Sequence, residues 1–195
     1  MPRVKIISDK AVLKAALTVM FRRGPSDFTL ADVAQVAGIA PATLVQRFGG
    51  KHGLIVAAFA EDNRRFADAL AGAPQAVGAE AVIDLFWTIT PSEADEDALA
   101  DQLLWLRQDM GDLRLNALAR ERFAILREAV AARLPALSMD GATAARLVEA
   151  QWQGALTQWA VERRGRLADY VAESLAAWFD LAAASLALTA SAAKA

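Results

Sequence analysis

The sequence predicts an all-α protein of about nine helices, with an N-terminal three-helix head and a larger helical body. Alanine, the strongest helix former, occupies 46 of the 195 positions. Apolar residues recur at helical spacing through most of the chain, and no segment alternates polar and apolar residues as a strand does. Hydrophobic residues make up 55% and charged residues 23% of the chain, a composition that excludes a disordered protein.

The first helix is predicted over residues 8–23. Ser8 has the side chain of an N-cap, and the Gly24-Pro25 pair is a strong stop signal. Apolar residues recur three and four positions apart along this segment, which predicts one buried face. That face consists of Val12, Leu13, Ala16, Leu17, Met20 and Phe21.

Two short helices are predicted next, joined by a tight turn. Thr29 precedes the first of them, and Asp32 follows three residues later, as in a short capping box. Gly38 ends this helix, because glycine adopts a positive φ without a steric cost. Pro41 opens the next helix, where its missing N–H is not needed, and the helix ends near Phe48.

A long fourth helix is predicted to open at Lys51, after the Gly49-Gly50 break. Gly53 is expected to destabilise its first turn by about 1 kcal/mol relative to alanine. His52, the single histidine, is interpreted as a surface residue, with pH sensing or DNA contact as the alternative. The body then contains five further predicted helices, over residues 78–90, 95–110, 113–134, 140–164 and 167–188.

Charge divides the chain into two predicted domains, a head over residues 1–51 and a body over residues 52–195. The head carries a formal charge of +5 and the body one of −7. A basic head on an acidic body suits a polyanionic partner at one end. The alternative is that these are ordinary solvated surface charges.

Composition and motifs also exclude several classes of function. The chain contains no cysteine and one histidine, so disulfides, thiolate metal sites and histidine-based catalysis are not expected. No nucleophile triad, metalloprotease motif or phosphate-binding loop is present, and we expect neither an enzyme nor a cofactor. The N-terminus has no signal-peptide core, and the apolar residues 175–190 contain Asp180, which favours a buried helix over a membrane span. We therefore expect a cytoplasmic protein with no membrane partner.

The two short helices joined at Gly38 form a helix-turn-helix, in which the second helix presents its N-terminal half to a major groove. Residues 30–51, with the sequence LADVAQVAGIAPATLVQRFGGK, resemble the DNA-binding segment of TetR-family transcriptional regulators. The resemblance covers about residues 8–60, and the remaining chain has the family's length and helix count. It implies a homodimeric, ligand-responsive repressor that binds double-stranded DNA at a near-palindromic operator.

The resemblance also identifies candidate DNA contacts. Val45 stands where the family usually has tyrosine, and Ala40 where it usually has a capping serine. Gln46 can pair with adenine, and Arg47 with guanine or a phosphate, so we expect modest direct base readout. The candidate residues are Pro41, Ala42, Thr43, Val45, Gln46 and Arg47 on the recognition helix, Lys51 on phosphate, Thr29 as a second-rank contact, and Arg3 and Lys5 in an N-terminal arm.

In the body, the resemblance implies that the last two helices of each chain form a four-helix dimer bundle. The candidate interface residues are Leu156, Val171, Leu175, Trp178, Phe179, Ala182 and Leu186. A two-fold dimer places its recognition helices about 34–36 Å apart, one turn of DNA. The alternative is that these apolar stripes belong to the core of a single chain.

An aromatic set in the body suits a small apolar or aromatic ligand. The candidate pocket residues are Phe86, Trp87, Trp105, Met110, Phe123, Gln151, Trp152 and Trp159. The alternative is an ordinary aromatic core. The competing function for the whole chain is a helical protein-interaction module whose helix-turn-helix no longer binds DNA.

Overall fold

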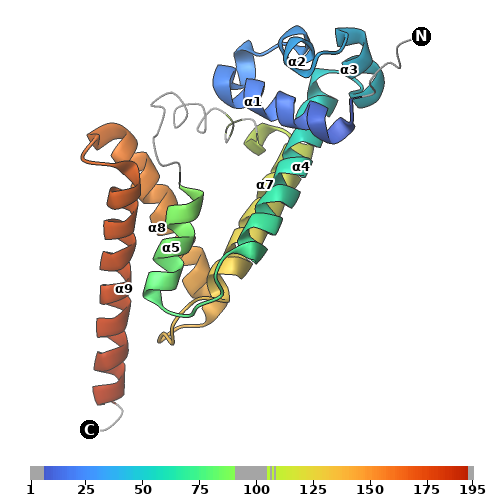
Figure 1. Cartoon of the computed structure of the whole chain (residues 1–195). Helices are drawn as coiled ribbons and strands as arrows, with labels where there is room; N and C mark the ends of the chain where they lie inside the picture. The colour runs from blue at the N-terminus through green and yellow to red at the C-terminus, as the bar shows by residue number, and fades with distance from the viewer. Residues whose placement is uncertain (1–6, 91–104, 106, 108, 193–195) are drawn as a thin grey trace. The chain divides into compact units, whose positions relative to one another are not determined.

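The computed structural model describes residues 7–90, 105, 107 and 109–192, and the secondary structure in these ranges is helical (Figure 1). Eight helices have defined bounds within them, so the predicted all-α class is confirmed. The helix predicted over residues 95–110 lies largely outside the described residues, although residues 105, 107 and 109–111 are helical. None of the described helices combines the length and hydropathy that crossing a membrane requires.

The chain divides into two compact units. The first unit comprises residues 1–66 and 100–122, and the second comprises residues 67–99 and 123–195. The functional boundary predicted at residue 51 remains a prediction, because the two units are defined by packing alone.

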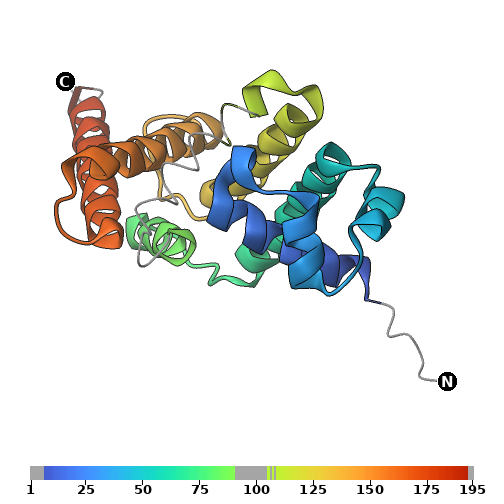
Figure 2. The same ribbon diagram turned by 90° about the horizontal axis from the view of Figure 1, so that it is seen from above.

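The first unit contains three complete helices, α1 (Asp9–Asp27), α2 (Leu30–Ala37) and α3 (Pro41–Phe48). It also contains most of α4 (Lys51–Gly72) and the first half of α7 (Leu113–Ala131). Figure 2 shows α1, α2 and α3 grouped around the start of α4. These helices share one apolar core, which includes Val12, Met20, Phe28, Val33, Leu44, Leu54 and Trp105.

Helix α1 begins as predicted, because the Ser8 side chain accepts a hydrogen bond from the Ala11 N–H at 3.3 Å. Gly24 has φ +73° and interrupts the helix at the predicted stop, but a short helical turn continues to Asp27. Phe21 is the exception on the predicted buried face, since it is exposed and packs edge-to-face on Phe59 with ring centroids 6.3 Å apart.

Polar contacts join α4 to α7 within the first unit. Asn63 is buried, and its amide donates to the Leu118 carbonyl at 2.8 Å and to Glu121 at 3.1 Å. Arg122 donates to Asp62 at 2.8 Å, and its guanidinium also lies over the Phe66 ring. The buried amide and the partly exposed ion pair beside it favour one register of the two packed helices.

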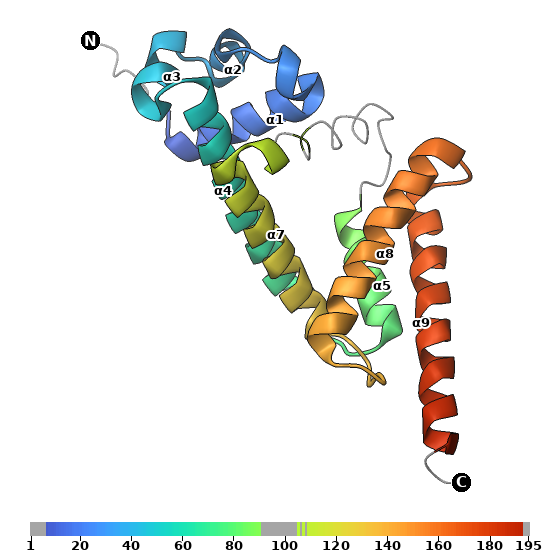
Figure 3. The ribbon, with the colours of Figure 1, turned by 180° about the vertical axis from the view of Figure 1, so that it is seen from behind.

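The second unit is built on α5 (Ala79–Ile89), α8 (Gly141–Glu162) and α9 (Leu167–Ala192), which lie side by side (Figure 3). Asp140 caps α8 by accepting from the Thr143 N–H at 2.9 Å. Arg127 on α7 forms an ion pair with the buried Glu149 on α8. Burial raises the pKa of Glu149, and the hydrogen bond and charge of Arg127 oppose that rise.

Arg133, two residues after the end of α7, is the largest fully buried side chain among the described residues, with 1% of its surface exposed. Its guanidinium donates to four backbone carbonyls, those of Pro74 at 2.9 Å, Ala129 at 2.7 Å, Leu70 at 3.2 Å and Ala73 at 3.3 Å. The carbonyls of Leu70 and Ala73 lie at the end of α4, and the carbonyl of Ala129 lies in the last turn of α7. A cation at helix C-termini is favoured by the helix dipoles and satisfies carbonyls that have no partner within the helix.

We expect Arg133→Met to lower the free energy of unfolding by about 3 kcal/mol, because it leaves several buried carbonyls without a donor. Denaturant unfolding followed by circular dichroism measures the change. Arg120→Met, at an exposed position of α7, is the matched control and should change stability by less than about 0.5 kcal/mol. If the two substitutions lowered the free energy of unfolding equally, the hydrogen bonds from Arg133 to these carbonyls would not contribute to stability.

Candidate nucleic-acid interface

Helix α2 begins with the predicted capping box. The Asp32 carboxylate accepts from the Thr29 backbone N–H at 2.8 Å and from the Thr29 hydroxyl at 2.7 Å, while the Asp32 N–H donates to that hydroxyl at 3.2 Å. The hydrogen bond from the Thr29 hydroxyl is the main cause that lowers the pKa of Asp32, and Arg23, 3.0 Å away, contributes. The hydroxyl of Thr29 is thus engaged in the cap, so a phosphate contact through it has to compete with Asp32.

The turn between α2 and α3 forms as the glycine predicts. Gly38 has φ +68°, and its N–H and that of Ile39 donate back to the last carbonyls of α2. Ile39 is half-buried against the core of the first unit, which fixes the angle between the two helices. Helix α3 starts at Pro41 with no side-chain cap from Ala40, as expected from the missing serine.

Helix α3 has one buried and one exposed face. Leu44 is completely buried and Phe48 is half-buried, and these two residues hold the helix on the core. The opposite face is exposed and contains Pro41, Ala42, Val45 and Gln46. We call this face the recognition surface, because a helix held in this way presents those side chains to a partner.

Arg47, which the sequence predicts as a DNA contact, is hydrogen-bonded within the chain, and its contact with DNA stays a prediction. Its Nη1 donates to the Ile7 carbonyl at 2.8 Å and to the Asp9 carboxylate at 3.2 Å. These contacts turn the guanidinium towards the start of α1 and leave 26% of the side chain exposed. The sequence contains no local signal for this pairing, because Asp9 lies 38 residues before Arg47. Thr43, one turn earlier on the same flank, is half-buried.

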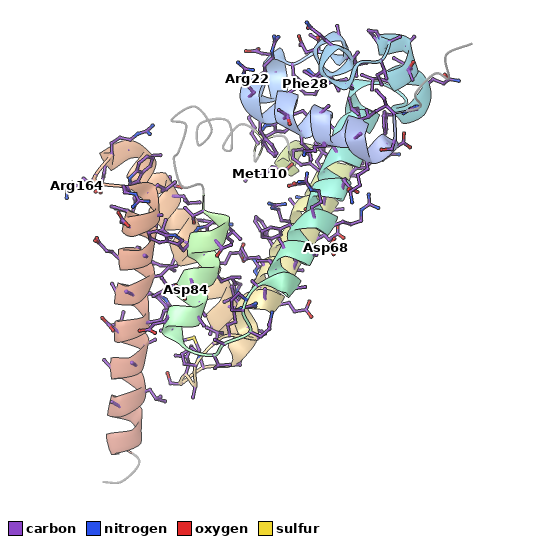
Figure 4. All side chains as sticks on the ribbon, viewed as in Figure 1. Arg22, Phe28, Asp68, Asp84, Met110 and Arg164 are labelled. Atoms are coloured by element: carbon purple, nitrogen blue, oxygen red, sulfur yellow. The ribbon has the colours of Figure 1, made fainter. Side chains whose placement is uncertain are left out.

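The other predicted basic contacts lie around the start of α4. Lys51 occupies its first position, half-buried, with the ammonium 4.1 Å from the centroid of the Phe28 ring. Such a cation–π contact holds the charge near the helix N-terminus, where backbone N–H groups also attract anions. Phe28 is labelled in Figure 4. Arg3 and Lys5 lie outside the described residues.

His52 has a specific partner that the sequence did not predict. Its Nε2 lies 2.6 Å from the Asp112 carboxylate, whose other oxygen accepts from the N–H groups of Arg114 and Leu115 at the start of α7. The Leu115 N–H is the main cause that lowers the pKa of Asp112, and the hydrogen bond with His52 adds to it. The pair joins the first turn of α4 to the residue that precedes α7.

The junction between α3 and α4 requires glycine. Gly49 and Gly50 have φ values of +76° and +116°, which side-chain-bearing residues rarely adopt. At Gly53, a Cβ atom would overlap the Phe48 carbonyl oxygen. The expectation that alanine would be better at position 53 is therefore wrong, because tight packing outweighs helix propensity.

The predicted pocket residues fall into different units. Trp105 and Met110 belong to the first unit, and Phe86, Trp87, Phe123, Gln151, Trp152 and Trp159 belong to the second. Trp105 is buried, with its ring 5.1 Å from that of Phe59, and its indole N–H has no hydrogen-bond partner in the described structure. Met110 is exposed (Figure 4).

In the second unit, three of these residues have polar groups that are hydrogen-bonded within the chain. The Trp152 indole donates to Thr90 at 3.0 Å, the Trp159 indole to the Gly165 carbonyl at 3.1 Å, and the Gln151 amide to Ser174 at 2.7 Å. Trp152 also packs on Phe86 at 5.2 Å, and Arg166 lies over the half-exposed Trp87. Phe123 is half-buried beside Arg127. Packing within one chain therefore accounts for most of this aromatic set.

The predicted dimer residues all belong to the second unit and differ in burial. Five of them, Leu156, Val171, Leu175, Phe179 and Ala182, are buried in a single chain. Trp178 is half-buried against Phe179, and Leu186 is exposed near the end of α9. The wide apolar stripes therefore serve mainly the core of the second unit. Within the described residues, no group of three or more acidic or histidine side chains is placed to hold a metal ion.

Residues 12–58 match the sequence profile of the bacterial regulatory proteins of the tetR family. No curated protein sequence matches this chain significantly. Solved structures share the fold over nearly the whole chain, including a transcriptional regulator from Rhodococcus sp. Rha1, with a TM-score of 0.74 and 16% identity over 90% of this chain and 96% of that one.

Two other structures of this fold are similar at comparable identity. A member of the TetR family from Streptomyces coelicolor has a TM-score of 0.65 and 19% identity, over 87% of this chain and 97% of that one. The transcriptional regulator FadR from Bacillus subtilis, in complex with stearoyl-CoA, has a TM-score of 0.59 and 16% identity, over 86% and 96%. The profile match and the shared fold confirm the resemblance to TetR-family transcriptional regulators.

We expect Gly53→Ala to lower the free energy of unfolding by roughly 1–3 kcal/mol, because the new Cβ forces the backbone of α3 and α4 apart. Helix propensity alone predicts a gain of about 1 kcal/mol, so the sign of the change separates the two effects. Gly72→Ala, at the open end of the same helix, is the control and should be neutral or stabilising. Stabilisation by both substitutions would contradict the close approach at Phe48.

Proposed function

We propose that this TetR-family protein is a DNA-binding transcriptional regulator that acts in the cytoplasm as a homodimer on a near-palindromic operator. The observation that carries the proposal is the position of α3, which is fixed by the buried Leu44 and presents an exposed face of four residues. The profile match covers this helix-turn-helix, and the head carries a net positive charge. Both features suit a helix that enters the major groove of DNA.

The dimer part of the proposal rests on the outer face of α8 and α9. Two hydrogen bonds join these helices, from Gln151 to Ser174 at 2.7 Å and from Tyr170 to Gln158 at 3.5 Å. Apolar or small residues, all exposed except the half-buried Gly154, recur at helical spacing along this side: Leu147, Gly154 and Val161 on α8, and Ala177, Leu181 and Ala184 on α9. Small residues among large ones allow helices from a second copy to approach closely, as a two-fold interface requires.

A small apolar or aromatic ligand in the second unit is part of the same proposal. A similar fold, that of FadR, was solved with stearoyl-CoA. Trp87 on α5 is half-exposed and offers an aromatic surface in this unit. A ligand of this kind regulates DNA binding only if it binds the DNA-competent and incompetent states unequally, and it then acts as an inducer of a repressor.

The test of DNA binding is fluorescence anisotropy with duplexes tiled from either side of the protein's own gene, against a scrambled duplex, over a series of salt concentrations. We expect saturable binding whose log–log salt slope is roughly −0.9 per neutralised phosphate. Lys51→Ala should weaken binding to all sequences and reduce the slope by about one contact. Arg146→Ala, at an exposed position of α8, is the control and should leave the slope unchanged.

The absence of salt-sensitive binding to any duplex, even at low salt, would contradict this proposal. It would favour instead a helical protein-interaction module whose helix-turn-helix does not bind DNA. Equal weak binding to every tiled duplex, with a steep salt slope, would support DNA binding. It would also indicate that the operator lies outside the tiled region.

The dimer face is tested by Leu181→Glu, because the leucine is 73% exposed in the single chain and a charge there would be buried between two copies. We expect the substitution to convert a dimer to a monomer in size-exclusion chromatography with light scattering. Leu113→Glu, at a leucine that is 91% exposed on α7, is the matched control and should leave the mass unchanged. A dimer that persists in the Leu181 variant would exclude this face.

A further inference from the structure

We propose that Ala42 and Val45 select thymine in the operator by contacting its C5 methyl group. This inference rests on the proposed function and specifies which bases the recognition surface reads. It is carried by the side chains that α3 leaves exposed and by the internal contacts that keep Arg47 away from them.

The recognition surface is mostly apolar. Ala42 and Val45 are three residues apart, so they are neighbours on one face of α3, and both are exposed. Val45 has 49% of its surface exposed, although valine is normally buried in a folded domain. Pro41 continues the apolar surface one turn earlier, and Gln46 is its one side chain with hydrogen-bonding groups.

Arginine is the usual reader of guanine, because its fork can donate two hydrogen bonds to the O6 and N7 atoms. Arg47 is the one arginine on α3, and its Nη1 already donates to the Ile7 carbonyl and to Asp9. Both hydrogen bonds are charge-assisted and hold the guanidinium towards the start of α1, so turning its fork onto a guanine in front of the recognition surface would weaken or break them. Arg47 is a positioning residue that ties the end of α3 to the start of α1.

The apolar side chains of the recognition surface distinguish bases because they cannot form hydrogen bonds with polar base edges. Thymine presents a methyl group beside its O4 acceptor in the major groove, whereas the other three bases present polar groups and no methyl group. Valine and alanine gain from covering a methyl group, but they leave a desolvated polar edge without a partner. The surface therefore favours thymine opposite Ala42 and Val45, and Gln46 can add a contact to adenine.

The experiment begins with selection of binding sites from a random duplex library by the full-length protein at fixed salt. Each thymine of the recovered half-site is then replaced by deoxyuridine, which lacks only the C5 methyl group. We expect one or two positions at which the replacement weakens binding about three- to fivefold per methyl, the value of burying one such group. At the other thymines the dissociation constant should stay the same.

Val45→Ala tests the assignment to a residue. It should weaken binding to the thymine site about threefold and make binding insensitive to uracil at one of the sensitive positions. Alanine is a better helix former than valine and position 45 is exposed, so the variant should fold, as circular dichroism can verify. Val77→Ala, at an exposed valine of the second unit, is the matched control and should retain the full uracil effect.

Two results would overturn the inference while leaving the proposed function intact. One is salt-sensitive, sequence-selective binding that is unchanged by uracil at every position. The other is a half-site with an obligatory guanine whose preference disappears in Arg47→Ala. A failure to select any sequence, together with no salt-sensitive binding, would instead overturn the proposed function itself.

Discussion

The position of α3 depends on a close approach of backbone to backbone, between the first turn of α4 and the carbonyl of Phe48. Glycine at position 53 leaves room for that carbonyl, and the positive φ values of Gly49 and Gly50 change the direction of the chain within two residues. Because the turn is so short, Leu44 and Leu54 are buried in the same core. Among the described residues, none covers the outer face of α3, and this exposure follows from the geometry of the junction.

Charged side chains complete the ends of the two helices that run through both units. In the first unit, Asp112 caps the start of α7 and is joined to His52 in the first turn of α4. In the second unit, Arg133 caps the other end of a helix, since its guanidinium donates to the last carbonyls of α4. Each contact places a charge where the helix leaves backbone groups without partners, so the electrostatics and the hydrogen bonds favour the same arrangement.

Features that depend on neighbouring residues could be predicted from the sequence, and features that depend on distant ones could not. Ser8, the Thr29 and Asp32 pair, Gly38 and Pro41 act within one helical turn, and the structure confirms each. The pairing of Arg47 with Asp9 joins residues far apart in the chain and has no local signature. Apolar periodicity showed that α9 is buried on a broad face, but it could not separate contacts within one chain from contacts with a second copy.

The distribution of tryptophan gives the molecule a built-in optical probe. Of the five indoles, Trp105 alone lies in the first unit, buried against Phe28 and Phe59 and close to the core that supports α3. Replacement of the other four by phenylalanine would leave one fluorophore whose emission follows the packing of that core. Since the chain contains no cysteine, a single introduced thiol would accept an energy-transfer partner at a chosen position without competing reactions.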